Sequence, residues 1–354
     1  MMDRQIRQPR RRSSLRAGML IVVTLAFLLT VLLALPASRA AVSIRMGYIG
    51  VSTDAGLFMA QDKGYFREQG LDLAVERLGA AADQMALLGA GRLQIATGGV
   101  SPTLFNAVSR GLPIAAVADK GSLRKGFGFN VFVVRKALVD SGQYKDVRDL
   151  RGRVLASNSP ASPINYETSM LLKSGGLTLR DVRMEYMDFS DEPAAMANGK
   201  IDAAVMVEPF ATASEERGIG KIITTLDRVI PDFQVALIFY NTDWARNHPD
   251  EARRWMIAYV KGLRYYTRAL QDRTVREDVI SIMTAHTPIK NRAVYDKMIW
   301  PGFNPDGAIN IRSLLDYQRW LVNERQVSEF LPPARLVDPS YAQYAVKTLG
   351  PWHP

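Results

Sequence analysis

The sequence predicts an α/β protein with two lobes and a helical C-terminal tail, and three observations lead to this prediction. Short apolar segments of strand type alternate with helical segments from residue 42 to residue 241. Such alternation is typical of βαβ units with mainly parallel sheets. After Asp243 the apolar residues recur at helical spacing instead. The chain of 354 residues, 47% of them hydrophobic, is also long enough for two packed cores.

The first 40 residues differ in composition from the rest of the chain. They contain seven arginines and one aspartate, so they carry +6 of the net charge of +10. A basic stretch precedes the apolar run Met19–Leu35, and the small residues Ser38 and Ala40 follow it. This order predicts a secretory signal peptide over residues 1–40, cleaved before Ala41. Because the run is long for a signal, an uncleaved membrane anchor is the alternative.

The remaining composition excludes several classes of function. A charge of +4 without a basic, aromatic-rich stripe predicts no nucleic-acid partner. The absence of cysteine excludes disulfides, thiol nucleophiles and thiolate metal sites. The three histidines all lie in the tail or at the terminus, which disfavours a Ser-His-Asp set or a three-histidine metal site. We therefore expect no catalytic residue, no metal and no cofactor.

The first lobe is expected over residues 41–130. Its predicted strands are residues 42–51, 71–78, 93–98 and 113–119. Its predicted helices are residues 55–70, 80–91 and 102–111. The last helix starts with a clear signal, since Ser101 is a good N-cap and Pro102 suits the first helical position.

The second lobe is expected over residues 131–236. Its predicted strands are residues 153–158, 182–189 and 201–207, and its predicted helices are residues 166–176 and 192–200. Apolar strand segments over 129–135 and 234–241 flank this lobe, which predicts a stiff two-strand hinge. Residues 237–354 are expected to return to the first lobe and to end in helices.

Residues 47–99 and 165–210 resemble the two halves of ABC-importer solute-binding proteins, within the nitrate, sulfonate, taurine and thiamine-pyrimidine-precursor group. The resemblance implies the type II periplasmic-binding fold, with two Rossmann-like lobes that close on a solute by hinge bending. It implies a periplasmic, monomeric receptor that delivers a small organic solute (a sulfonate, a pyrimidine or an aromatic compound) to an inner-membrane permease.

Four turns at the ends of predicted strands hold the candidate ligand-binding residues, because the crevice of an open α/β sheet lies beyond the carboxyl ends of its strands. Each lobe supplies two of the turns. The candidates are Ser52, Thr53, Asp54, Gly98, Gly99, Ser101, Asn158, Ser159, Ser162, Asn165, Tyr166 and Glu208.

Each candidate has a structural alternative. The turn at 52–54 and Ser101 are equally suited to capping the helices that follow them. If Asp54 faced the crevice, it would favour a solute with a hydrogen-bond donor or a positive group. The loop 158–165 could bind an oxyanion or merely be held by its prolines, and it lacks the Gly-Ser start of the resembled family. Tyr166 could cover a solute face, whereas Glu208 could equally form a salt bridge.

Two other functions stay open beside transport. A sensory or adaptor receptor would use the same clamshell to bind a signalling partner. An enzyme is the third possibility, because a related fold serves fungal thiamine-pyrimidine synthesis. The chain has no lysine in the glycine turn 98–101 and no GxGxxG, HExxH or GxSxG motif. The four turns also hold no arginine or lysine, so an organic solute is expected rather than nitrate.

Overall fold

The computed structural model describes residues 41–353. The predicted signal or anchor, with its apolar run Met19–Leu35, lies outside the described residues. Within the described part of the chain, no helix is both long and apolar enough to cross a membrane.

The first sheet belongs to lobe I and has the strand order β2-β1-β3-β10-β4. Its strands are β1 (Val42–Tyr48), β2 (Leu71–Arg77), β3 (Ile95–Gly99), β4 (Ile114–Leu123) and β10 (Phe233–Asn241). Strand β1 pairs in parallel with β2 and β3, whereas β10 runs antiparallel to β3 and β4. The strands β3, β4 and β10 are almost entirely buried, which explains why they read as apolar runs.

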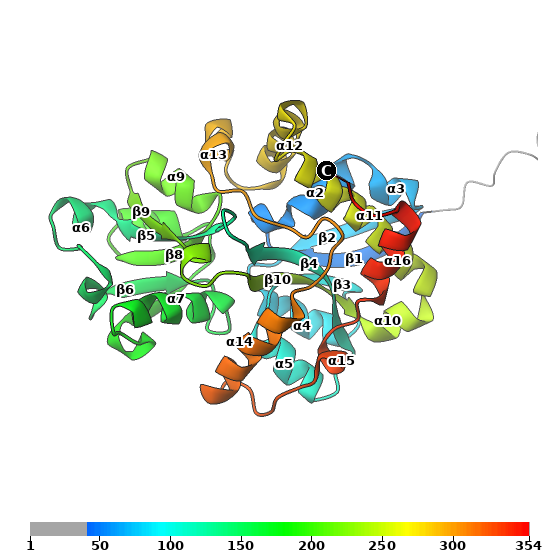
Figure 1. The fold of residues 1–354 in the computed structure, drawn as a ribbon, viewed down its shortest axis with the longest axis horizontal. Helices are drawn as coiled ribbons and strands as arrows, with labels where there is room; N and C mark the ends of the chain where they lie inside the picture. Colours follow the sequence, from blue (N-terminus) through cyan, green and yellow to red (C-terminus); the bar gives the residue numbers. More distant parts are fainter. Residues whose placement is uncertain (1–40, 354) are drawn as a thin grey trace, which may run out of the picture. The chain divides into compact units, whose positions relative to one another are not determined.

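The second sheet belongs to lobe II and has the strand order β7-β6-β8-β5-β9. Its strands are β5 (Asn130–Arg135), β6 (Val154–Ser157), β7 (Arg183–Tyr186), β8 (Ala203–Val207) and β9 (Gly220–Thr225). Strand β9, which the sequence did not predict, is an edge strand antiparallel to β5. The chain crosses between the sheets through residues 124–129 and 226–232, so two connections join the lobes (Figure 1). The predicted α/β class with two lobes is confirmed.

Helices follow most strands in both lobes (Figure 1). Lobe I carries α2 (Ala55–Asp62), α3 (Tyr65–Glu68), α4 (Ala81–Gly89) and α5 (Pro102–Ser109), and lobe II carries α6 (Lys136–Asp140), α7 (Pro163–Ser174), α8 (Glu192–Ala197) and α9 (Phe210–Glu216). Two boundaries differ from the prediction. The helix expected over 55–70 is broken at Gly64, whose φ is 74°, and α7 starts at Pro163 rather than at residue 166.

The C-terminal tail is helical, as predicted, but it contacts both lobes. Its helices are α10 (Thr242–Asn247), α11 (Pro249–Arg268), α12 (Arg273–His286), α13 (Arg292–Lys297), α14 (Ile311–Asn323), α15 (Pro333–Leu336) and α16 (Ser340–Leu349). The long helix α11 packs on α2 of lobe I. Helix α13 reaches lobe II, where Lys297 lies 2.6 Å from Glu216 of α9, and α14 packs its Tyr317 and Trp320 rings on Tyr166 of α7.

The contact between α11 and α2 is unusually close. Gly262 of α11 leaves room for the backbone of α2, and a Cβ atom there would overlap Gly56 O and approach Ala60 N to 2.9 Å. Both obstacles are helix backbone, which cannot move without displacing α2.

Gly262→Ala is therefore expected to destabilise the protein by about 1–3 kcal/mol through overpacking. The matched control is Gly89→Ala in α4, where the nearest atom is the flexible end of the exposed Leu112 side chain at 3.3 Å. This control should be neutral or stabilising by up to about 1 kcal/mol, because alanine favours helix over glycine. Urea denaturation of both variants checks the difference, and equal effects would contradict the packing account.

Candidate functional site

A cavity of about 40 Å³ lies between the two lobes, at the carboxyl ends of their parallel strands. Much of its wall is apolar and includes Ile49, Phe129 and Phe189. The polar side chains in the wall come from both lobes: Thr53, Ser101, Lys120, Asn130, Asn158, Ser159 and Ser162. A cavity of this size holds a few water molecules at most.

The lobes touch each other around this cavity. Ser52 N of lobe I donates to Glu208 O of lobe II at 3.2 Å. Asn158 Nδ2 donates to Gly79 O at 3.4 Å. Gly99 approaches Pro163 so closely that a Cβ atom at residue 99 would lie 2.7 Å from Pro163 Cγ. The structure is thus a closed form of the two lobes.

Ser101 occupies the N-cap position of α5, with extended backbone angles, but its side chain forms no capping hydrogen bond. Its Oγ atom is buried without a partner, and the residue is 2% exposed. Ser162 of lobe II behaves differently, because its Oγ caps α7 by accepting from Ile164 N at 3.1 Å. The hydroxyl of Ser101 therefore has no hydrogen-bond partner among the described residues, whereas that of Ser162 is already engaged.

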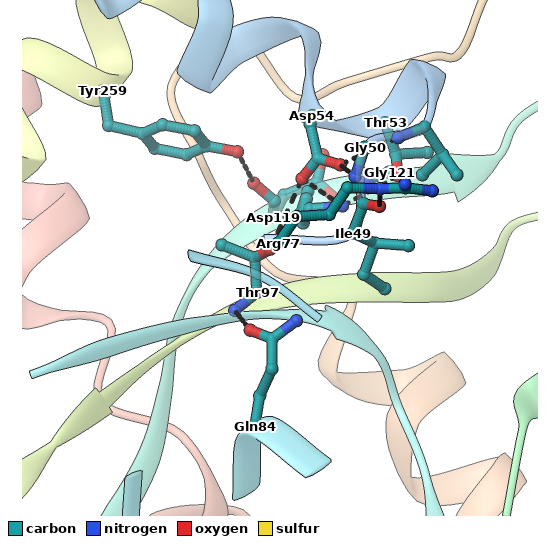
Figure 2. Close-up of polar contacts among 12 residues, drawn as sticks. Ile49, Gly50, Thr53, Asp54, Arg77, Gln84, Thr97, Asp119, Gly121 and Tyr259 are labelled. Atoms are coloured by element: carbon teal, nitrogen blue, oxygen red, sulfur yellow. Dashed lines mark hydrogen bonds and ion pairs between the residues drawn. The ribbon is translucent and has the colours of Figure 1, made fainter. Parts of the chain in front are cut away.

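Asp54 does not line the cavity; its carboxylate is held within lobe I (Figure 2). Oδ2 accepts from Gly50 N at 2.8 Å and from Val51 N at 3.1 Å. Oδ1 accepts from Thr97 Oγ1 at 3.3 Å and lies 2.9 Å from Lys120 Nζ. The carboxylate expected to meet a solute instead pairs with a buried lysine.

Lys120 itself was missed by the sequence reasoning. It lies in β4, two residues after the apolar run 114–118, and is only 1% exposed. A lysine close to an apolar strand segment could have pointed to it, but the strand was predicted to end at Asp119, one residue before Lys120. The cavity wall therefore does contain a cation, contrary to the expectation drawn from the four turns.

Asn130 is the second functional candidate that the sequence reasoning missed. It is the first residue of β5, and its Nδ2 donates to both carboxylate oxygens of Glu167 at 2.8 Å. Its Oδ1 atom is buried without a partner. Glu167 thereby fixes the amide so that its carbonyl oxygen is left for the cavity.

The loop from 158 to 165 is held by one of the predicted residues. Asn165 Nδ2 donates to Ser159 O at 3.2 Å and to Pro160 O at 2.8 Å. This leaves Asn158 and Ser159 in the cavity wall, and Asn158 Oδ1 has no partner. Asn165 thus positions the loop and does not itself line the cavity.

Tyr166 lies elsewhere. Its ring packs against Phe233, Tyr317 and Trp320, with centroids 4.9–5.1 Å apart. Tyr166 lies near the start of α7, and its ring faces α14. Tyr166 lines a separate surface hollow with Asp232 and Asn310.

Glu208 is also turned away from the cavity. Its carboxylate accepts from Thr212 Oγ1 at 2.7 Å and from Ile299 N at 3.2 Å. It therefore joins lobe II to the tail, and burial raises its pKa to about 7. Of the remaining predicted residues, Thr53 and Gly99 line the cavity, whereas Ser52 and Gly98 do not.

Two further carboxyl groups of lobe II have raised pKa values. Burial raises the pKa of Glu167 to about 8, despite its bonds from Asn130. Burial raises the pKa of Glu192 well above its ordinary value, and both of its carboxylate oxygens lack a partner. Among the described residues no cluster of three potential metal ligands occurs.

These raised pKa values predict that the free energy of unfolding falls as the pH rises. In the unfolded chain a glutamate titrates near pH 4.3, so the folded state alone retains these protons from about pH 5 upward. The stability that each protonated glutamate contributes is fully present below about pH 4.3. It declines as the pH rises and is lost once the pH has passed about 7 for Glu208 and about 8 for Glu167. Denaturant unfolding between pH 5 and pH 9 should show the decline, with a limit of about 1.4 kcal/mol per pH unit for each group.

Glu167→Gln should make this decline shallower, while the exposed control Glu76→Gln should leave it unchanged. An unaltered slope in Glu167→Gln would show that Glu167 titrates as it does in the unfolded chain.

Comparison with solved structures shows the fold. The ligand-binding component of an ABC-type import system from Staphylococcus aureus superposes with a TM-score of 0.70 at 20% identity, over 86% of this chain and 99% of that one. The alkanesulfonate-binding protein SsuA from Xanthomonas axonopodis pv. citri gives a TM-score of 0.66 at 17% identity, over 86% and 99% of the two chains. The predicted periplasmic-binding-protein fold is confirmed.

Sequence comparison finds relatives that are named as enzymes, whereas the structural relatives above are named as binding proteins. The 4-amino-5-hydroxymethyl-2-methylpyrimidine phosphate synthase THI5 of Saccharomyces cerevisiae is 25% identical over 221 residues, which are 59% of this chain and 62% of that protein. The chain thus spans less than two thirds of the curated relatives it matches. The NMT1/THI5-like family model matches residues 52–269, more than half of the chain. The chain belongs to the NMT1/THI5-like family.

Proposed function

We propose that this chain is the solute-binding receptor of an ABC importer and holds a small organic solute in the cavity between its lobes. One observation carries the proposal. Buried polar atoms from both lobes, namely Ser101 Oγ, Asn130 Oδ1 and Asn158 Oδ1, belong to cavity-lining residues and have no partner. An unsatisfied buried polar group costs about 1–3 kcal/mol, so a solute that bonded to these atoms would stabilise the closed form.

A solute can enter only if the lobes separate. An apolar cavity that binds benzene measures about 150 Å³, and the closed cavity is about 40 Å³. The two connections between the sheets are the natural hinge. A solute of that size is accommodated only if side chains of the cavity wall move aside as the lobes close on it.

The wall favours a solute that combines hydrogen-bond donors with an apolar body. Asn130 Oδ1 and Asn158 Oδ1 accept, whereas the Ser101 hydroxyl can donate or accept. Apolar side chains such as Phe129 and Phe189 would contact the remainder. A pyrimidine or another nitrogen-containing ring fits this pattern best, and the pyrimidine in the names of the sequence relatives supports it. A sulfonate, suggested by the structural relatives, is second.

The cellular setting follows from this function. A receptor of this kind works as a monomer in the periplasm and presents its closed form to a permease in the inner membrane. Residues 1–40 would supply export, either as a cleaved signal or as an anchor. The named import components among the structural relatives support the permease as partner.

Synthesis of a pyrimidine phosphate is the second candidate function, favoured by the names of the sequence relatives. The two functions differ in turnover. Mass spectrometry of a bound solute after prolonged incubation should recover it unchanged from a receptor and altered from an enzyme.

Ser101→Ala should weaken solute binding about fivefold, because it removes about 1 kcal/mol of hydrogen bonding. The solute would come from a thermal-shift screen of residues 41–354 against pyrimidines, sulfonates and aromatic acids. Titration calorimetry gives the affinity, and urea unfolding should show unchanged stability. The control Ser162→Ala removes a helix cap and should cost about 1 kcal/mol of stability. If Ser101→Ala loses stability alone, its hydroxyl is structural.

Gly99→Ala should weaken binding by hindering closure, since its Cβ would lie 2.7 Å from Pro163 Cγ. Small-angle scattering with solute should show a larger radius of gyration than the unchanged protein gives. Adding Pro163→Ala removes the obstructing ring and should restore affinity. A double variant as weak as the single one would argue against steric obstruction.

A further inference from the structure

Lys120 and Asp54 form a buried ion pair at the cavity wall that the hydrogen-bonding account above does not use. Their side chains are 1% and 0% exposed, and Lys120 Nζ lies 2.9 Å from Asp54 Oδ1. Removing two charges from water can cost more free energy than their mutual attraction returns. Replacing such a pair by well-packed apolar residues therefore often leaves a protein at least as stable. The pair therefore calls for a reason beyond stability.

The ammonium group of Lys120 has one N–H to spare. An ammonium carries three N–H donors. Thr53 Oγ1 accepts one of them at 2.9 Å, and the ion pair with Asp54 Oδ1 at 2.9 Å occupies at most one more. Both Lys120 and Thr53 line the cavity, so the ammonium end of the side chain is at the wall.

Asp54 is fixed on the far side of this ammonium and does not reach the cavity. Backbone N–H groups of Gly50 and Val51 hold Oδ2, and Thr97 Oγ1 donates to Oδ1 (Figure 2). The carboxylate is therefore held by the lobe I framework. It compensates the charge of Lys120 from behind, where a solute cannot replace it.

No other residue in the cavity wall is charged at neutral pH. The charges of Lys120 and Asp54 cancel, so the closed site has a net charge of zero. An anionic solute would bring an uncompensated charge into a buried place, which is strongly unfavourable. An uncharged solute with a hydrogen-bond acceptor could use the spare N–H at no such cost.

We propose that the Asp54–Lys120 pair makes Lys120 a specificity-determining donor that selects uncharged solutes over anions of the same shape. This inference rests on the proposed solute-binding function and concerns the same cavity. It separates the two roles of the pair: Lys120 contacts the solute, and Asp54 acts through Lys120 as a positioning and charge-compensating residue.

The test compares probes that differ in charge but hardly in shape, namely benzenesulfonamide with benzenesulfonate and benzamide with benzoate. Titration calorimetry of the unchanged protein should favour the uncharged member of each pair. Asp54→Asn leaves the ammonium uncompensated and should shift the affinity ratio at least tenfold towards the anion. Lys120→Met leaves the carboxylate uncompensated and should shift the ratio in the opposite direction. The double variant should return the ratio towards that of the unchanged protein.

Opposite shifts distinguish selection from a structural role, which would change stability and lower all affinities alike. If Asp54→Asn does not fold, Lys120→Met and the double variant still test the direction in which the affinity ratio shifts. The control Asp202→Asn breaks an ion pair at the ends of β5 and β8 that face away from the cavity, in which Arg135 Nη2 lies 2.8 Å from Asp202 Oδ1, and it should leave the ratio unchanged.

Two failures are distinguishable. Folded single variants that bind the probes with the ratio of the unchanged protein would overturn this inference alone. An unchanged protein that binds no probe, and no compound of the thermal-shift screen, would contradict the proposed function as well.

Discussion

Strand β10 pairs with both β3 and β4 in the lobe I sheet, yet the chain reaches it only after lobe II has been built. Lobe I cannot be completed without a return crossing, so the two connections between the lobes are fixed by the sheet itself. The cavity lies beside them: Lys120 comes from the end of β4, Asn130 from the start of β5 and Ala236 from β10. Any movement at these two connections would therefore move residues of the cavity wall.

In each lobe a buried carboxyl group behind the cavity wall holds a polar side chain of the wall. In lobe I a carboxylate behind the wall, Asp54, holds the ammonium of Lys120. In lobe II Glu167 holds the amide of Asn130. In both cases the acid is buried and turned away from the cavity, while the group that it holds lines the wall. The two acids thus orient polar groups of the cavity wall without lining the cavity themselves.

The fold was largely predictable because buried strands read as apolar runs and the βα alternation is regular. The position of β10 and the pairing of β9 were not, since strand order depends on contacts between distant segments. Of the candidates predicted at strand ends, six line the cavity between the lobes: Thr53, Gly99, Ser101, Asn158, Ser159 and Ser162. Sequence could not tell which side chains are taken up by other partners, as Asp54 and Glu208 are. Lys120 and Asn130 were missed because the search was confined to four turns, whereas Lys120 lies one residue beyond a predicted strand and Asn130 lies inside one. Tyr166 packs on the rings of Phe233, Tyr317 and Trp320 and not on the cavity, and such contacts between distant segments are not visible in the sequence.

A crystal structure of the protein with the compound that gives the largest thermal shift tests the account most directly. We predict unaltered solute between the lobes, within hydrogen-bond distance of Ser101 Oγ and Asn130 Oδ1. The account is contradicted if the compound lies elsewhere, for example in the hollow of about 870 Å³ bounded by Leu112, Arg246 and Arg335, or if it has been converted to a product.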